Sequence, residues 1–308
     1  MTKTLLFATM MAAVAFTSCS NDATVLDDSI VEQHQSQTFT FRMTGADLNV
    51  TQTRAALTAD SRALTDLYVL DYDKQTGALL QVLHQVSSDP KFAEPSLTLA
   101  YGQHTIRFVA TRSTESMLTM ADGTEFVTTP GTVQAIGANV PTLYTASKIS
   151  DTFAAEVDVT AGAGSAGSAT VTLNRAASRM SIQVKDVVPT GAKWVSIDIA
   201  TAYPTLPLTT LVPTTTAAQH TDIDVSSVVG RKDQTLAVFM LAPTTAWTSD
   251  VTITTKRTDN SEISSFTLEG VSFLRNRTTI VSGEIFQRSS PLTLNVNDAW
   301  EDDEVVNF

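Results

Sequence analysis

Apolar and polar residues alternate with a period of two along several stretches of the chain. These stretches are TFTFRM (38–43), HTIRFVATR (104–112), RMSIQVKDV (179–187), WVSIDIA (194–200), DVTITTKR (250–257) and PLTLNVN (291–297). Such alternation predicts strands that bury one face and leave the other wet. Because glycine and proline punctuate the strands and no long helical stripe is present, we predict an all-β fold of two antiparallel β-sandwich domains.

The order of these patterns predicts four parts of the chain. We place a lipoprotein signal peptide at 1–18, an acidic tether at 19–37, an N-terminal sandwich at 38–170 and a C-terminal sandwich at 171–308. The low-complexity stretch TAGAGSAGSAT (160–170) indicates the boundary between the two sandwiches, and it fits either a domain linker or a long hairpin loop.

The first nineteen residues predict export and lipid attachment. A positive Lys3 precedes an uncharged apolar run at 5–16, which is too short to span a membrane but typical of a signal peptide. Thr17 and Ser18 then lead to Cys19, in a sequence that resembles a bacterial lipobox. An ordinary signal peptide with an incidental cysteine is the alternative. Acylation of Cys19 would anchor the chain to the outer membrane through two or three acyl chains.

Composition narrows the classes of function. The chain has 43% hydrophobic residues, a net charge of −12 and a single cysteine. The acidic balance argues against nucleic acid as a partner. With no cysteine after position 19, the fold is expected to hold together by packing and not by disulfides.

Motifs for chemistry are weak, and we predict no enzyme activity, no cofactor and no metal site. The four histidines lack zinc-ligand spacing. Gly162, Gly164 and Gly167 match a dinucleotide-binding spacing, but an alternating strand follows them where that motif requires a helix. DYDKQTG (71–77) begins like a calcium loop but has Val82 at its twelfth position, so we interpret it as a hairpin turn.

The layout of the whole chain resembles the fimbrillins of Bacteroidales, the lipoprotein pilins that form the shaft, anchor and tip of type V pili. The resemblance rests on Cys19 and on the segments FTFRM, TRAALTADSRALTDLYVLDYD (53–73), LTLAYGQHTIRFVAT (97–111), VTLNRAASRMSIQVKDVVP (171–189), LRNRTTIVSGEIF (274–286) and LTLNVNDAWEDDEVV (292–306). It implies two transthyretin-like sandwiches. It also implies cleavage by an arginine-specific protease, after Arg54 and before Ala55, or after Arg62 and before Ala63. The alternative is that neither arginine is cleaved.

The same resemblance implies assembly by strand exchange. Phe39, Phe41 and Met43 would form a displaced strand, which we expect at a sheet edge, where one strand can replace another. The donor segment would carry Leu292, Leu294, Val296 and Trp300. Residues 291–308 are otherwise simply the last strand of their own domain.

We therefore expect a structural subunit of a cell-surface fimbria that supports adhesion. Its partners would be other fimbrial subunits, an unidentified host or bacterial surface receptor, and the outer membrane through lipid on Cys19. A membrane-retained fimbrial anchor or a tip subunit is one alternative. A glycan-binding surface lipoprotein is another, although aromatic residues make up only 7% of the chain.

Overall fold

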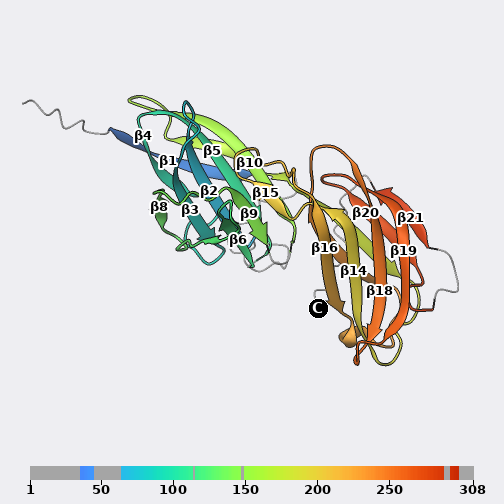
Figure 1. The fold of residues 1–308 in the computed structure, drawn as a ribbon. Coiled ribbons are helices and arrows are strands. Elements are labelled where there is room, and N and C mark those ends of the chain that lie inside the picture. The colour runs from blue at the N-terminus through green and yellow to red at the C-terminus, as the bar shows by residue number, and fades with distance from the viewer. Residues whose placement is uncertain (1–34, 45–63, 114, 147–148, 288–291, 298–308) are drawn as a thin grey trace, which may run out of the picture. The chain divides into compact units, whose positions relative to one another are not determined.

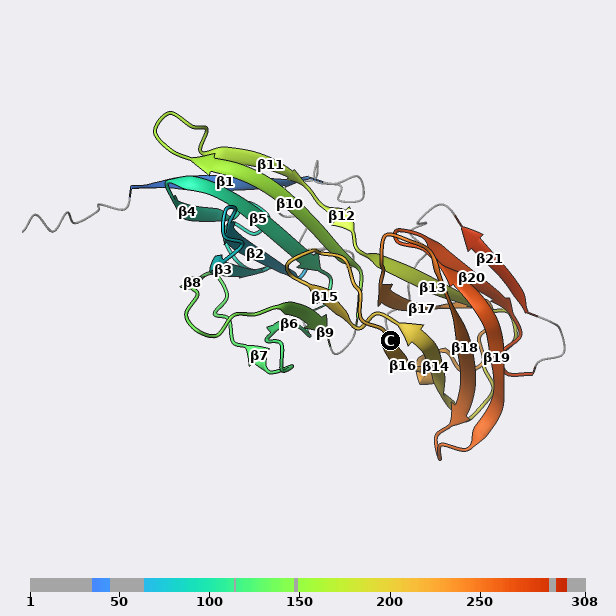
Figure 2. The same cartoon turned by 45° about the horizontal axis from the view of Figure 1, so that its top comes forward.

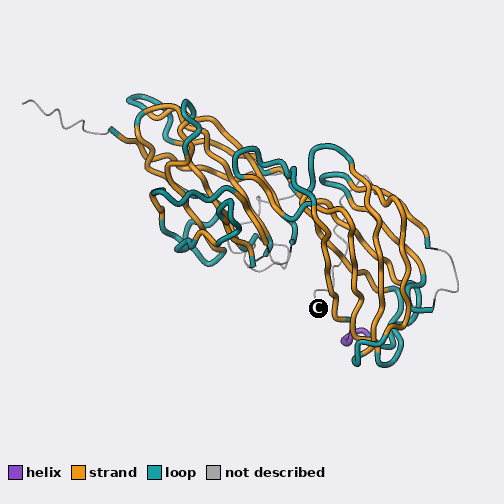
Figure 3. Tube along the Cα trace, in the orientation of Figure 1, coloured by secondary structure: helices purple, strands orange, loops and turns teal. Residues whose placement is uncertain are grey.

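The described part of the protein is built almost entirely from strands. The computed structural model describes residues 35–44, 64–113, 115–146, 149–287 and 292–297, and residues 35–308 make up one compact unit. In these described ranges the only helical element is a 3-10 turn, η1 (Ser226–Val228) (Figure 3). None of the helical structure in the same ranges is long and apolar enough to cross a membrane. The all-β prediction is confirmed.

The first sandwich is made of two sheets that enclose one core (Figures 1 and 2). Its strands are β1 (Ser36–Thr44), β2 (Asp66–Asp73), β3 (Leu79–Val86), β4 (Ser96–Ala100), β5 (Gly102–Thr111), β8 (Val133–Ala135), β10 (Thr152–Ala161), β11 (Ser168–Thr172) and β12 (Asn174–Arg175). One sheet has the order β11-β1-β4 and the other β12-β10-β5-β2-β3-β8. All their pairings are antiparallel except β1 with β11.

A third, smaller sheet covers the outer face of the six-stranded sheet. It has the order β15-β9-β6-β7 and consists of β6 (Ser116–Thr119), β7 (Glu125–Phe126), β9 (Leu143–Ala146) and β15 (Thr205–Pro207). A second core lies here, in which Tyr68 and Leu70 of β2 pack in one cluster with Leu206 and Leu208. Strand β2 is thus buried on both faces, which explains why its central run, Leu67 to Leu70, is continuously apolar and does not alternate.

The second sandwich has two four-stranded sheets. Its strands are β13 (Ala177–Val184), β14 (Ala192–Ala202), β16 (Ala217–Asp224), β17 (Gln234–Leu241), β18 (Trp247–Arg257), β19 (Glu262–Phe273), β20 (Thr278–Gly283) and β21 (Thr293–Asn297). The sheet orders are β17-β13-β20-β21 and β16-β14-β18-β19. Val195, Ile197 and Ile199 of β14 are inner residues and are fully buried, whereas Asp198 is exposed, as the alternation predicts; Ser196, on the same face as Asp198, is buried as well.

The two sandwiches are not strictly consecutive along the chain. Position 170 lies inside β11, which pairs with β1 of the first sandwich. The glycine-rich stretch joins β10 of the six-stranded sheet to β11 of the three-stranded sheet, and it therefore lies within the first sandwich. Leu206, Leu208 and Leu211, which follow β14, belong to the core beneath the small third sheet.

Asp151 joins two arginines in a buried ion cluster just before β10. Its Oδ1 accepts from Arg175 Nε at 2.7 Å, and its Oδ2 lies 3.1 Å from both Arg175 Nη2 and Arg112 Nη1. Arg175 Nη1 also donates to Asn276 Oδ1 at 3.0 Å, so the cluster ties the end of the first sandwich to the β19–β20 turn. The side chains of Arg175 and Asp151 are only 1% and 2% exposed.

We expect Asp151→Ala to lower the free energy of unfolding by ~3–5 kcal/mol, because it leaves a buried guanidinium without its carboxylate. Asp158→Ala is the matched control. Asp158 pairs with Lys74 at 2.6 Å on the surface, where an ion pair contributes about 1 kcal/mol or less. Urea unfolding of the three proteins measures both values, and equal losses would contradict a stabilising role for the buried cluster.

Candidate assembly site

Strand β1 is the middle strand of the three-stranded sheet. It pairs with β11 in parallel from Thr40 to Thr44, and with β4 in antiparallel from Ser36 to Thr40. Flanking bonds extend both ladders, since Tyr101 N donates to Gln35 O at 2.8 Å and Leu173 N to Thr44 O at 2.7 Å. We call the space between β4 and β11 that β1 occupies the β1 slot.

The prediction that this strand lies at a sheet edge is wrong. Alternation along a sequence shows which face of a strand is buried, but it does not show how many neighbouring strands bond to its backbone. The middle position of β1 affects how strand exchange could work. A strand that replaced β1 would gain backbone partners on two sides, whereas an edge strand has them on one side only.

The three apolar residues of β1 lie in the centre of the first core. Phe39, Phe41 and Met43 are 3%, 0% and 1% exposed. The ring of Phe41 meets Phe108 of β5 edge-on, with the ring centroids 5.4 Å apart. Burying three such side chains contributes ~1.5–3 kcal/mol each. Side-chain packing, together with the two ladders, therefore holds β1 in the β1 slot.

The opposite face of β1 is polar and bonds across the sheet through hydroxyl groups. Thr40 Oγ1 lies 2.9 Å from Ser96 Oγ of β4, and Thr44 Oγ1 lies 3.3 Å from Thr172 Oγ1 of β11. Cross-strand pairs of this kind contribute ~0.2–1 kcal/mol each, so they matter less than the apolar face. They explain why threonine occupies alternate positions here.

The start of β1 is clasped by the loop between β10 and β11. Gln37 Nε2 donates to Ser165 O at 3.0 Å, and Gln37 Oε1 accepts from Gly162 N at 3.0 Å. A Cβ atom at Gly167 would lie 2.9 Å from Thr38 O, a distance that real Cβ atoms do not tolerate. The lack of a side chain at Gly167 therefore lets the loop approach the backbone of β1 closely, which gives this glycine a packing role.

The predicted donor strand, β21, is held much less firmly than β1. Within the described residues it pairs only with β20, so it is an edge strand of its sheet. Leu294 and Val296 are 46% and 39% exposed, while Leu292 is half-buried and packs against the core of the second sandwich. Leu292 Cδ2 would lie 2.5 Å from a Cβ at Gly283, so the absence of a side chain there makes room for it.

Several predicted site residues cannot be placed. Cys19, the two arginine–alanine pairs at 54–55 and 62–63, and Trp300 all lie outside the described residues. The structure does place the candidate displaced strand and the first three donor residues, in different sandwiches. The walls of the β1 slot and the Gln37 clasp were not predicted as functional. Leu97, Leu99 and Val171 alternate in the sequence, but alternation alone did not show that they flank β1.

Histidine and carboxylate groups form paired contacts in the first sandwich. His104 is buried, with Nδ1 2.7 Å from Asp71 Oδ1, and His84 Nε2 lies 2.9 Å from Asp66 Oδ1. Across the described ranges no three such groups, counting cysteine, are gathered in a way that could hold a metal ion. The turn at 74–77 is the hairpin turn that the sequence predicts, with Asp73 Oδ1 accepting from Thr76 N at 2.7 Å.

Comparisons with known proteins find likeness in structure alone. No protein-family model matches the chain, and no curated protein sequence matches it. A solved structure described as a candidate adhesin of Bacteroides ovatus is 12% identical with a TM-score of 0.49, covering 86% of this chain and 95% of its own. The fimbrial anchor protein Mfa2 of Porphyromonas gingivalis is 13% identical with a TM-score of 0.44, covering 85% and 98%. The tip fimbrial protein Mfa3 of the same organism, with a C-terminal truncation, is 12% identical with a TM-score of 0.38, covering 85% and 98%.

We expect Phe41→Ala to lower the free energy of unfolding by ~3–5 kcal/mol, because it leaves a cavity where the ring meets Phe108. Thr40→Ala, on the wet face of the same strand, should cost about 1 kcal/mol or less. Urea unfolding of the full chain measures both changes. Similar losses from the two variants would show that the core does not depend on β1.

Proposed function

We propose that this chain is a structural subunit of a cell-surface fimbria, exported as a lipoprotein and joined to other subunits by strand exchange at the β1 slot. The observation that carries the proposal is the position of β1. It lies between β4 and β11 in their sheet, and its apolar side chains fill the first core. Removing β1 would leave two strands unpaired and a core open.

Loss of β1 would create a site that another strand can fill. The inner edges of β4 and β11 would expose unpaired backbone groups, which is the condition for strand addition. The apolar residues around Phe108 would also be exposed to water, because Phe39, Phe41 and Met43 are their partners in the core. A replacement strand therefore needs apolar side chains at every second position and a polar opposite face.

The segment at the end of the second sandwich meets this requirement. Leu292, Leu294 and Val296 repeat the spacing of Phe39, Phe41 and Met43. Because Leu294 and Val296 are 46% and 39% exposed on β21, moving them into the β1 slot would bury their remaining surface, which contributes less than half of the ~1.5–3 kcal/mol of full burial for each side chain. The strand would also exchange one bonding neighbour for two.

Lipid attachment and cleavage after an arginine would determine when this strand exchange takes place. Lipid on Cys19 would hold the precursor at the outer membrane with β1 in place. Cleavage after Arg54 or Arg62 would release the lipidated tether together with β1, since both arginines follow this strand in the chain. The subunit would then pass from the outer membrane into the fimbria, where its partners are other subunits and a surface receptor.

An anchor or tip subunit is the alternative among fimbrial proteins. Each of these roles would leave a different segment of the chain in place. An anchor would retain acylated Cys19 and hence β1. A tip subunit would keep its last strand within its own sandwich. The descriptions of the two solved Porphyromonas gingivalis structures name these two roles for those proteins.

A glycan-binding surface lipoprotein is less well supported by the side chains. Trp247 packs against the core of the second sandwich, with its ring 5.3 Å from that of Phe273, and its Nε1 donates to Thr201 O at 3.2 Å. It therefore serves the interior of the sandwich and does not form an exposed aromatic platform. Loss of binding to a glycan array on Trp247→Ala, with the fold intact, would favour this alternative.

We expect protein recovered from intact fimbriae to begin at Ala55 or Ala63, and the cell-bound precursor to carry acyl chains on Cys19. Intact-mass measurement of the two forms detects both the acylation and the cleavage. Arg54→Gln combined with Arg62→Gln should keep the precursor uncut. Protein that remains acylated at Cys19 in assembled fimbriae would assign the anchor role instead.

We further expect Leu294→Asp to abolish polymers that form after purified full chain is treated with an arginine-specific protease. A charged side chain at this position is tolerated in the exposed β21 but not in the apolar β1 slot. Asn295→Ser, on the opposite face of the strand, is the control and should leave polymer length unchanged. Size-exclusion chromatography and electron microscopy give the readout, and normal polymers from Leu294→Asp would contradict donation by this strand.

A further inference from the structure

A bend at residues 285–287 follows β20, and a single buried carboxylate binds its backbone amides. Asp186 Oδ1 accepts from Ile285 N at 3.1 Å. Its Oδ2 accepts from Phe286 N and from Gln287 N, both at 2.8 Å. Successive amides in a bend form a concave site for an anion, and their bonds to a charged carboxylate are about twice as strong as bonds between neutral groups. We call Asp186 together with residues 285–287 the Asp186 clamp.

The sheet topology places this carboxylate beside the bend. Strand β13 runs parallel to β20, with Val184 opposite Gly283 at the end of both strands (Figure 2). Parallel strands finish at the same edge of a sheet, so the second residue after β13, Asp186, meets the second residue after β20, Ile285. Lys185 N also donates to Gly283 O at 2.8 Å, which continues the pairing up to the clamp.

The side chains of the bend are held as firmly as its amides. Ile285 and Phe286 are 0% and 5% exposed and belong to the core of the second sandwich. The hydroxyl of Ser264 on β19 donates to Ile285 O. Strand β21, in contrast, pairs only with β20 among the described residues, and it exposes Leu294 and Val296.

The chain therefore passes from a firmly held bend to a weakly held strand between Gln287 and Leu292. Proteins open locally in contiguous units, and the least buried and least bonded unit opens first. Detachment of β21 is thus expected to stop at the Asp186 clamp and to leave β20 in its sheet.

We propose that Asp186 is a positioning residue for strand exchange, which keeps residues 285–287 in their own sandwich so that β21 leaves without β20. This role rests on the proposed function, whereas the strength of the clamp can be measured in a chain that has exchanged no strand. Leu292 is five residues after Gln287, and each residue spans up to ~3.5 Å, so a donated β21 begins within ~17 Å of the clamp. The β1 slot of the receiving subunit has to come equally close, which makes the joint between subunits short.

Amide hydrogen exchange in the intact full chain, followed by NMR, tests the clamp. We expect the amides of residues 285–287 to exchange at least about tenfold more slowly than the β21 amides that bond to β20. Asp186→Asn preserves the size of the side chain but removes its charge, and it should speed exchange at 285–287 about tenfold. Asp250→Asn is the matched control and should not change these rates. Asp250 is exposed on β18 and also accepts a backbone amide, that of Gly270, at 2.8 Å.

Polymers formed after cleavage of the full chain by an arginine-specific protease give a second readout. Residues 285–287 should exchange slowly in wild-type polymers and quickly in Asp186→Asn polymers. Electron microscopy should show a wider spread of subunit spacing in the Asp186→Asn polymers, because their joints are longer. A wild-type chain that forms no polymers would overturn strand exchange and with it this role of Asp186, but slow exchange at 285–287 in the intact chain would still establish the clamp.

Three results in the intact chain would overturn the clamp itself. Equal wild-type rates at 285–287 and in β21 would show that the two segments open as one unit. Unchanged rates in Asp186→Asn would show that the carboxylate does not hold the bend. An equal increase in the central strand β14 would indicate a general loss of stability. If Asp186→Asn fails to fold, Ser264→Ala removes the hydroxyl that bonds to Ile285 O and must speed exchange at 285–287 relative to β14.

Discussion

The backbone pairing of β1 on both sides is the constraint on which the first sandwich depends. A strand that bonds to β4 on one side and to β11 on the other cannot be removed without breaking two ladders. Its three apolar side chains also fill the core between the two sheets. Backbone pairing and side-chain burial act on the same nine residues, so the integrity of this sandwich is concentrated in a short segment near the start of the fold.

The two ends of the described fold differ in how they are held. Strand β1 is a central strand with a buried face, whereas β21 is an edge strand whose residues at 294 and 296 are exposed. A strand with one bonding neighbour and little buried surface costs less to detach than one with two neighbours and a full apolar face. Because β21 costs less to detach than β1, the proposed exchange would move β21 from its edge position into the β1 slot.

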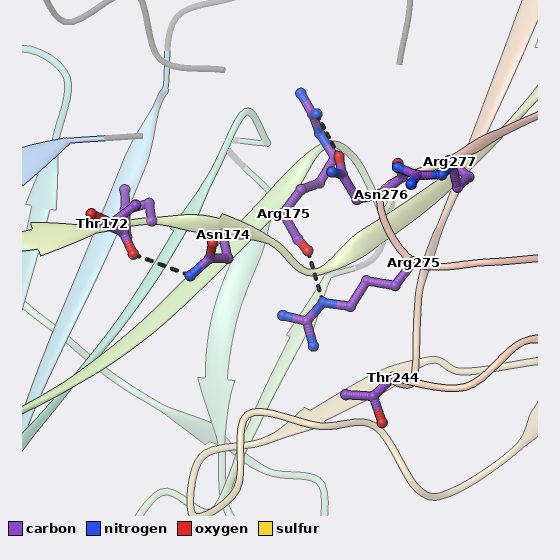
Figure 4. A pocket seen from close by; sticks show the side chains of 8 residues that line it. Thr172, Asn174, Arg175, Thr244, Arg275, Asn276 and Arg277 are labelled. Carbon is purple, nitrogen blue, oxygen red and sulfur yellow. Dashed lines mark hydrogen bonds between the residues drawn. The ribbon is translucent and has the colours of Figure 1, made fainter. Parts of the chain in front are cut away.

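The region between the two sandwiches combines packing with charge. Residues after β14 return to pack on the small third sheet, and Arg175 reaches from the Asp151 cluster to Asn276. Arg175 also lines a pocket together with Arg275 and Arg277 (Figure 4). Removing one partner of the buried pair of Arg175 and Asp151 is costly, because it leaves an uncompensated charge in the interior.

The sequence by itself determined the positions of the strands in the six alternating stretches, the buried face of β1 and the hairpin turn at Asp73, because alternation and turn chemistry are local properties that depend on neighbouring residues. It did not show that both faces of β5 and β13 are buried, nor that Leu294 and Val296 of β21 are exposed. It also supplied the composition that excludes disulfides after Cys19 and the residues that carry the family resemblance. Only the tertiary structure decided that β1 is a middle strand, that a third sheet buries the far face of β2, and that Arg175, Arg275 and Arg277 line one pocket. The physical reason is that strand neighbours and charge clusters arise from contacts between residues far apart in the chain. Such contacts cannot be inferred from the pattern of neighbouring residues. Alternation indicates which face of a strand carries the apolar side chains, but not which strands pair with it.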